Sequence, residues 1–136
     1  MSPLFYERQG QGRGDDLKSF RSLIAWQKAM VLARKTYQLT KRFPPEELYG
    51  LTSQLRRCSV SVPANIAEGY GRYLTNDNIR FLRIANGSLY ELQTLLELAC
   101  DVGYIQTNEF EMIKRDSEEM VRILSGYIKK LSEKQR

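Results

Sequence analysis

The chain has 136 residues, of which 42% are apolar and 27% charged, with a net charge of +5 and no histidine. This length fits one domain with a buried core. The lack of histidine excludes Ser-His-Asp and Cys-His nucleophile systems and histidine-ligated zinc. Two cysteines, Cys58 and Cys100, are too few for a four-ligand metal site. We therefore expect reduced, buried thiols, no metal, no cofactor and no enzymatic activity.

The N-terminal region is rich in glycine and polar residues. Gly10, Gly12 and Gly14 alternate with polar side chains, which predicts a flexible N-terminal extension over residues 1–20 and one folded domain over 21–136. The chain has no run of about 18 apolar residues and begins without the apolar segment of a signal peptide. We therefore expect a cytoplasmic protein without contact to a membrane.

The first predicted helix spans residues 22–42, with Ser22 as its N-cap and Pro44-Pro45 behind its end. Its apolar residues follow the 3-4 spacing of a left-handed bundle. They are Leu23, Trp26, Met30, Ala33 and Tyr37. Leu32 and Leu39 fall on the opposite, basic side, and exposed leucines at a spacing of seven suggest a contact between subunits.

The second predicted helix begins near Glu46 and ends at Gly69 and Gly71, with a kink or short break at Pro63. Its expected buried side consists of Leu51, Leu55, Cys58, Val62 and Ile66. The third follows Thr75, its candidate N-cap, and ends before Gly103, a residue suited to the left-handed C′ position.

The third helix carries two apolar rows and therefore needs two partners. One row is Phe81, Ala85, Ser88, Leu92, Leu95, Ala99 and Val102, and the other is Leu82, Leu89 and Leu96. The small residues Ala85, Gly87 and Ser88 predict close helix packing.

The fourth helix begins near Asn108, with Glu111 in a capping-box position. Its apolar row is Phe110, Ile113, Ser117, Met120, Leu124, Tyr127 and Leu131. Together these elements predict an all-α, antiparallel, up-down-up-down four-helix bundle with a kinked second helix.

Six basic residues and no acidic residue lie between positions 21 and 42. They are Arg21, Lys28, Arg34, Lys35, Lys41 and Arg42. Arg21, Lys28, Lys35 and Arg42 share one face, because a step of seven residues turns a helix by only about 20° from a full repeat. Arg34 and Lys41 form a flanking row. The six residues together, which we call the basic stripe, predict a nucleic-acid-binding surface that tracks phosphates. The alternative is a solvated face that pairs with acidic residues of neighbouring helices.

A second polar stripe follows the second helix. It consists of Gln54, Arg57, Ser61, Asn65, Glu68 and Arg72. Amides, a hydroxyl and opposite charges can satisfy one another in a hydrogen-bond network between helices or subunits. The alternative is part of a ligand or RNA surface. Glu68 is the one acid for which we expect a buried setting, but no second carboxylate or nucleophile accompanies it.

Three segments resemble a bacterial four-helix-bundle family first found encoded in intervening sequences of large-subunit ribosomal RNA genes. They are LIAWQKAMVLARKTYQLTKRFP, ELYGLTSQLRRCSVSVPANIAEGYGR and FLRIANGSLYELQTLLELACDVGYI. The blocks SVPANIAEGYGR and ANGSLYEL are the specific part of the match, and the N-terminal extension departs from the family. The motif residues are Gln54, Arg56, Arg57, Pro63, Asn65, Glu68, Gly69, Arg72, Gly87 and Glu91.

The resemblance implies a four-helix bundle, cyclic pentamers among related proteins, and no established enzymatic activity. It also implies a similar fold to the accessory subunit of diversity-generating retroelements, a basic pentamer that binds its reverse transcriptase and nucleic acid. We therefore expect a non-enzymatic homo-oligomer, a pentamer by resemblance, that binds RNA or DNA and no small-molecule substrate. The alternatives are an accessory subunit of a reverse transcriptase and a pure scaffold.

Overall fold

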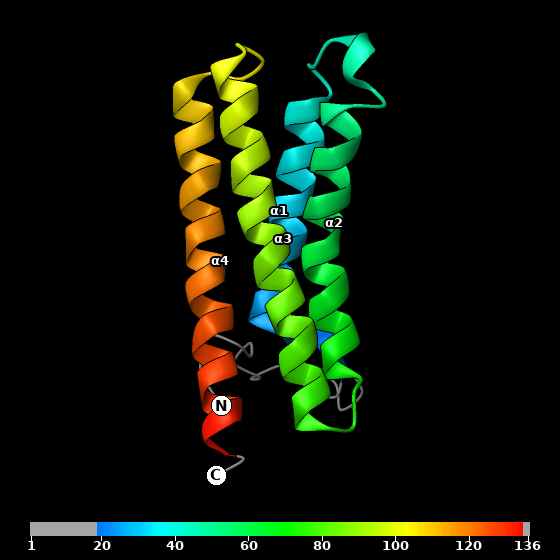
Figure 1. Ribbon diagram of the computed structural model, residues 1–136, viewed down its shortest axis with the longest axis vertical. Coiled ribbons are helices and arrows are strands. Elements are labelled where there is room, and N and C mark those ends of the chain that lie inside the picture. The colour runs from blue at the N-terminus through cyan, green and yellow to red at the C-terminus, as the bar shows by residue number, and fades with distance from the viewer. Residues whose placement is uncertain (1–18, 135–136) are drawn as a thin grey trace.

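Four long helices make up the computed structural model, which describes residues 19–134. They are α1 (Ile24–Thr40), α2 (Leu51–Tyr70), α3 (Thr75–Asp101) and α4 (Thr107–Glu133), with the short 3₁₀ helices η2 (Phe20–Ser22) and η3 (Pro45–Glu47) before α1 and α2. Successive helices run in opposite directions, and each packs against its two neighbours in the bundle (Figure 1). The predicted all-α, up-down-up-down bundle is therefore confirmed.

The predicted extension over residues 1–20 lies almost wholly outside the described residues. Of its members, Ser19 and Phe20 are described, and they belong to the folded domain. The Phe20 ring packs edge-on against Trp26, with 5.3 Å between the ring centroids.

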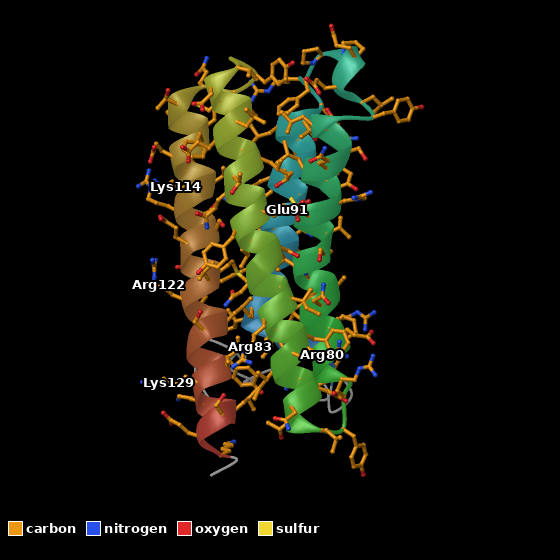
Figure 2. The ribbon with its side chains drawn as sticks, viewed as in Figure 1. Arg80, Arg83, Glu91, Lys114, Arg122 and Lys129 are labelled. Carbon is orange, nitrogen blue, oxygen red and sulfur yellow. The ribbon has the colours of Figure 1, made fainter. Side chains whose placement is uncertain are left out.

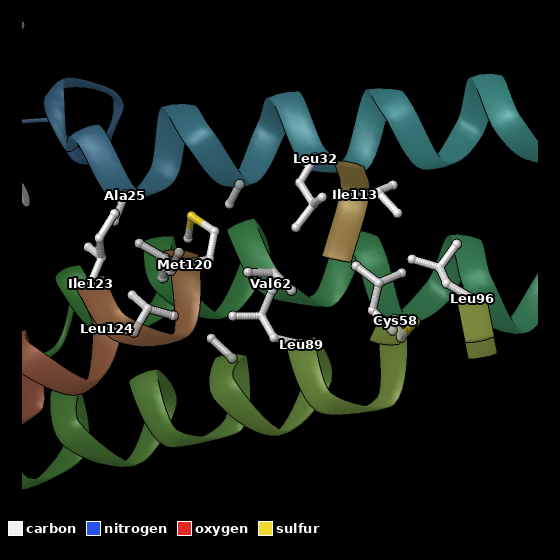
Figure 3. Packing of buried hydrophobic residues seen from close by; sticks show 14 of the residues in the cluster. Ala25, Leu32, Cys58, Val62, Leu89, Leu96, Ile113, Met120, Ile123 and Leu124 are labelled. Carbon is white, nitrogen blue, oxygen red and sulfur yellow. The ribbon is translucent and has the colours of Figure 1, made fainter. Parts of the chain in front are cut away.

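The core is built from the apolar rows of all four helices (Figure 3). The predicted buried sides of α2 and α4 are confirmed in full, from Leu51 to Ile66 and from Phe110 to Leu131. Burial of each large apolar side chain contributes about 1.5–3 kcal/mol, which makes these rows the main source of stability. Val62 of α2 and Leu124 of α4 are both 0% exposed.

The second apolar row of α3 is buried inside one chain. Leu82, Leu89 and Leu96 are fully buried, because α3 packs against both α2 and α4. The second row therefore needs no other subunit to cover it. In the first row Phe81 and Leu95 are half-buried, and Val102, at the C-terminal end of the helix, is 52% exposed.

The orientation of α1 about its own axis differs from the prediction. Leu32 is 2% exposed and Leu39 packs against the core, whereas Tyr37, expected in the core, is 41% exposed. Small and hydroxyl-bearing residues share the buried face with Leu32. Thr36 belongs to it because its hydroxyl donates to the Leu32 carbonyl at 3.0 Å, which satisfies the polar group within the helix.

The helix starts lie one or more residues from the predicted caps. Ser22 belongs to η2, and Thr75 is the first residue of α3. In α4 the capping pair is Gln106 and Glu109 rather than Asn108 and Glu111. The backbone amide of Gln106 donates to the Glu109 carboxylate at 3.0 Å. The prediction named an amide and a glutamate for this pair, as observed, but placed both residues two positions too late.

The second helix differs from the prediction at its start and its interior. Glu46 lies in η3, and α2 itself begins at Leu51. The helix runs without a break through Pro63, so the short break is absent, while the kink stays a prediction. Gly69 is a buried interior residue rather than a stop. Gly71 is the C-cap.

At the end of α3, Gly103 has a φ of 87° and takes the predicted C′ position. The amides of Tyr104 and Gly103 donate to the carbonyls of Ala99 and Cys100 at 2.9 and 3.0 Å, the pattern of a Schellman motif.

Glu47 links the connection before α2 to the connection after α3 through hydrogen bonds. Its carboxylate accepts a hydrogen bond from the Tyr104 hydroxyl at 2.7 Å and another from the Leu51 amide at 3.1 Å. The bond from Tyr104, followed by the bond from the Leu51 amide, lowers the pKa of Glu47 below its ordinary value of 4.5. In Glu109 the bond from the Gln106 amide lowers the pKa likewise, with help from Arg42.

These two carboxylates predict an acid-sensitive part of the stability. A group whose pKa is lowered by folding stabilises the native state above its unfolded pKa, and this contribution is lost as the pH falls through the native pKa. We therefore expect the free energy of unfolding to decrease below a pH of about 4.5. Urea unfolding should show a smaller decrease for the Glu47→Gln/Glu109→Gln variant. An equal decrease in both proteins would contradict this assignment.

Candidate nucleic-acid interface

Three of the six predicted basic residues form ion pairs with α4. Lys28 contacts Glu119 at 3.0 Å, Lys35 contacts Asp116 at 2.7 Å, and Arg42 contacts Glu109 at 2.5 Å. Their side chains are about half exposed, so each pair adds at most about 1 kcal/mol to stability. The pairs nevertheless neutralise the charge of this face. This agrees with the alternative given by the sequence, in which the basic residues pair with acidic residues of a neighbouring helix.

The other three basic residues of the stripe have different surroundings. Arg21 lies over the Phe20 ring and donates to the Ser19 hydroxyl. Arg34 and Lys41 make no ion pair with a carboxylate among residues 19–134. Both lie on the side of α1 that faces α2, and both are exposed. The structure therefore separates three cations that are paired with α4 from Arg34 and Lys41, which lie beside α2. Arg34 also lines the hollow between α1 and α4, and Arg21 belongs to neither set.

Two adjoining hollows follow the seam between α1 and α2. The first measures about 460 Å³ and is lined by Tyr37, Leu48, Tyr49, Thr52, Ser53, Arg56, Arg57 and Val60. The second measures about 410 Å³ and is lined by Met30, Ala33, Arg34, Tyr37, Gln38, Lys41, Val60 and Pro63. They share Tyr37 and Val60, and we call them together the α1/α2 surface.

The α1/α2 surface combines positive charge with exposed apolar side chains. Four cations line it, namely Arg34, Lys41, Arg56 and Arg57, and its lining contains no aspartate or glutamate. By contrast, the hollow of about 710 Å³ between α1 and α4 is lined by Glu109 and Asp116 as well as by cations. Charges of one sign in a concave surface add their potentials, so the α1/α2 surface attracts anions.

Arg56 is the most firmly positioned cation of this surface. Its Nε donates to the Thr40 hydroxyl at 2.9 Å, and its guanidinium lies 4.7 Å from the centre of the Tyr37 ring. Arg57, the next residue, is exposed and lines the same hollow. From the sequence Arg56 is a motif residue of the family, with no role predicted for it. Tyr49, which is 94% exposed, was not predicted as part of a site.

The polar stripe of α2 separates into three parts. Ser61 and Asn65 form a network with α3, in which the hydroxyls of Ser61 and Ser88 lie 2.8 Å apart and the Asn65 amide donates to Ser61. Glu68, expected to be buried, is exposed and pairs with Arg72 one turn later.

The remaining members, Gln54 and Arg57, are both exposed. The network at Ser61 thus favours a structural role for the middle of the stripe. In the described chain the stripe provides no buried acid.

Further cations lie on α3 and α4. Figure 2 shows Arg80, Arg83 and Lys129 toward one end of these helices, with Arg122 near the middle of α4 and Glu91 farther along α3. Arg80 and Arg83 line a hollow of about 510 Å³ together with Asn76, Ile79 and Ile84. This hollow has two cations and no aromatic ring in its lining, so the α1/α2 surface offers more contacts to a nucleic acid.

The thiols are free. Cys58 is buried, and burial followed by the charge of Glu91 raises its pKa to about 12, which makes it a poor nucleophile at neutral pH. Cys100, expected to be buried, is half-buried. Within residues 19–134 no cluster of acids and cysteines could hold a metal ion, and no helix there is long and apolar enough to cross a membrane.

The fold and this surface define a four-helix bundle with a filled core and an external, cation-lined groove. The chain belongs to the family of 23S rRNA-intervening sequence proteins, whose model matches residues 21–126. The family expected from the sequence motifs is thereby confirmed.

A solved structure supports the same assignment. It is the crystal structure of a protein of unknown function from the S23 ribosomal protein family of Bacteroides thetaiotaomicron. The two chains are 27% identical, with a TM-score of 0.70, and the match covers 77% of this chain and 98% of the other. A search of curated proteins finds no match.

Proposed function

We propose that this protein is a non-enzymatic, homo-oligomeric helical bundle that binds RNA or another nucleic acid through the α1/α2 surface. The observation that carries the proposal is the set of four cations around Tyr37 in a surface without a carboxylate. The family's connection with 23S rRNA genes fits a cytoplasmic location. Arg34 and Lys41 remain from the predicted stripe, and Arg56 and Arg57 join them.

The chemistry of the surface favours contacts to phosphates. Arginine presents a planar set of donors that suits phosphate oxygens, and Arg56 is already oriented by Thr40 and Tyr37. A pre-oriented donor loses less conformational entropy on binding than a free side chain. Phosphate contacts position a protein without reading bases, so we expect weak sequence specificity and strong dependence on salt.

An exposed apolar row on α3 supports self-association. Tyr90, Leu98 and Val102 are 57%, 49% and 52% exposed and follow one another at spacings of eight and four residues. At 3.6 residues per turn these positions spread over about 120° of the helix surface, and apolar side chains exposed together in this way are suited to a contact between subunits. It replaces Leu32 and Leu39 of α1, whose spacing suggested such a contact from sequence. A ring of subunits, a pentamer by resemblance, would repeat the α1/α2 surface around its circumference.

The proposal predicts different effects for two double variants that remove the same charge. Arg34→Gln/Lys41→Gln should weaken binding of a labelled, unstructured RNA about tenfold at low salt, because two phosphate contacts are lost. The slope of log K against log salt should decrease by about 1.4 if both residues neutralise phosphates on a single strand. Fluorescence anisotropy at several salt concentrations measures both quantities.

The matched control is Lys28→Gln/Lys35→Gln, which removes two cations already paired with Glu119 and Asp116. We expect it to change affinity less than threefold. Equal losses in both variants would assign the binding to net charge rather than to the α1/α2 surface. Light scattering with the absorbance ratio at 260 and 280 nm tests the oligomer on the same sample, and a monomer would remove that part of the proposal.

A further inference from the structure

The hollow beside Arg56 has flat, stackable walls. The Arg56 guanidinium covers part of the Tyr37 ring at 4.7 Å, while Tyr37 itself stays 41% exposed. A guanidinium plane and a phenol ring are both surfaces on which nucleic-acid bases stack. Because the bond from Nε to Thr40 fixes the orientation of the guanidinium, this stacking surface exists before any ligand binds.

Tyr49 lines the same hollow from a different element. Its side chain is 94% exposed, and the adjacent Leu48 is 49% exposed. The segment is nevertheless held in place, since Glu47 is bonded to Tyr104 and to the first amide of α2, and the Gly50 amide donates to the Glu47 carbonyl at 2.9 Å. An exposed aromatic side chain on an anchored connection is available to a ligand at little cost in backbone entropy.

Cations line the same two hollows as these aromatic groups. Arg57 lines the hollow that contains Tyr49, and Lys41 lines the adjoining hollow on the other side of Tyr37. Neither makes an ion pair with a described carboxylate. Aromatic rings beside unpaired cations are the arrangement by which proteins bind single strands without sequence preference.

We infer that the α1/α2 surface accepts unpaired nucleotides, with bases stacked on Tyr49 and on the Tyr37–Arg56 pair and phosphates held by Lys41 and Arg57. This inference rests on the proposed function and specifies its ligand as single-stranded nucleic acid. In a duplex the bases are already stacked on one another, so their faces are closed to Tyr49. A duplex can use the cations alone and gains nothing from the aromatic rings.

The test compares an unstructured RNA strand with the duplex that it forms with its complement, both measured by fluorescence anisotropy at one low salt concentration. Wild-type protein should bind the strand at least tenfold more tightly than the duplex. Tyr49→Ala should weaken binding of the strand about tenfold, because one stacking contact is lost, and leave the duplex unchanged. Tyr49→Phe keeps the ring and should retain the affinity.

The matched control is Tyr73→Ala, which removes a fully exposed tyrosine outside the α1/α2 surface and should change neither affinity. Equal binding of strand and duplex, with no effect of Tyr49→Ala, would overturn this inference while the loss in Arg34→Gln/Lys41→Gln still upheld the proposed function. Absence of binding to both RNAs and to the DNA strand of the same sequence would overturn the two together.

Discussion

Replacement of Leu32 by alanine is expected to lower the free energy of unfolding by about 2–5 kcal/mol, the range for leucine removed from a packed core. Leu32 is 2% exposed and belongs to the core formed with residues of α2, α3 and α4 (Figure 3). The cost combines the lost transfer energy of the side chain with the cavity that rigid neighbours leave behind. Urea unfolding at one fixed protomer concentration measures the effect, since association also shifts apparent stability.

Val31 provides the control for this substitution. It precedes Leu32 in the same helix but is 42% exposed, so Val31→Ala should change stability by no more than about 0.5 kcal/mol. A Leu32→Ala protein that unfolds like the wild type but dissociates in light scattering would place Leu32 at a contact between subunits, as its spacing with Leu39 suggested. That result would also invalidate the orientation of α1 described above.

The helices differ in how well their apolar pattern predicts their orientation. In α2 and α4 large apolar residues occupy one continuous row, and the row alone determines the buried face. In α1 the buried face includes Ala25, Ala29, Thr36 and Thr40, whose small size or hydroxyl gives them little weight in a hydrophobic pattern. The large residues Trp26 and Tyr37 then dominate the pattern, although they lie at the edge of the core or outside it.

Only part of the candidate site could be predicted, because sequence patterns reveal neighbours on one helix but not contacts between helices. The row of cations is a local feature of the sequence, but the acidic residues that neutralise part of its charge are not. The acids that pair with Lys28, Lys35 and Arg42 lie 91, 81 and 67 residues away, so only the antiparallel register of α1 and α4 brings them together. Tyr49 could not be identified either, because its proximity to Tyr37 depends on how the connection after α1 returns to α2.

Gly69 shows most directly how a single residue determines the packing of two helices. An added Cβ at Gly69 would lie 2.8 Å from the Asn78 Oδ1, 3.1 Å from the Phe81 Cβ and 3.2 Å from the Asn78 carbonyl oxygen. The Asn78 side chain can rotate away, but the carbonyl and the Phe81 Cβ move only with the backbone of α3. We therefore expect Gly69→Ala to lower the free energy of unfolding by about 1–3 kcal/mol, the usual cost of overpacking.

The same substitution at Gly87 should have the opposite sign. Gly87 lies inside α3 with no atom within 4 Å of an added Cβ, so alanine there should raise the free energy of unfolding by about 0.5–1 kcal/mol through helix propensity alone. Urea unfolding of both variants separates the two effects, because propensity favours alanine equally in the two helices. If Gly69→Ala were also stabilising, α3 would have room to move away from α2. The close packing of the two helices would then not explain the glycine at this position.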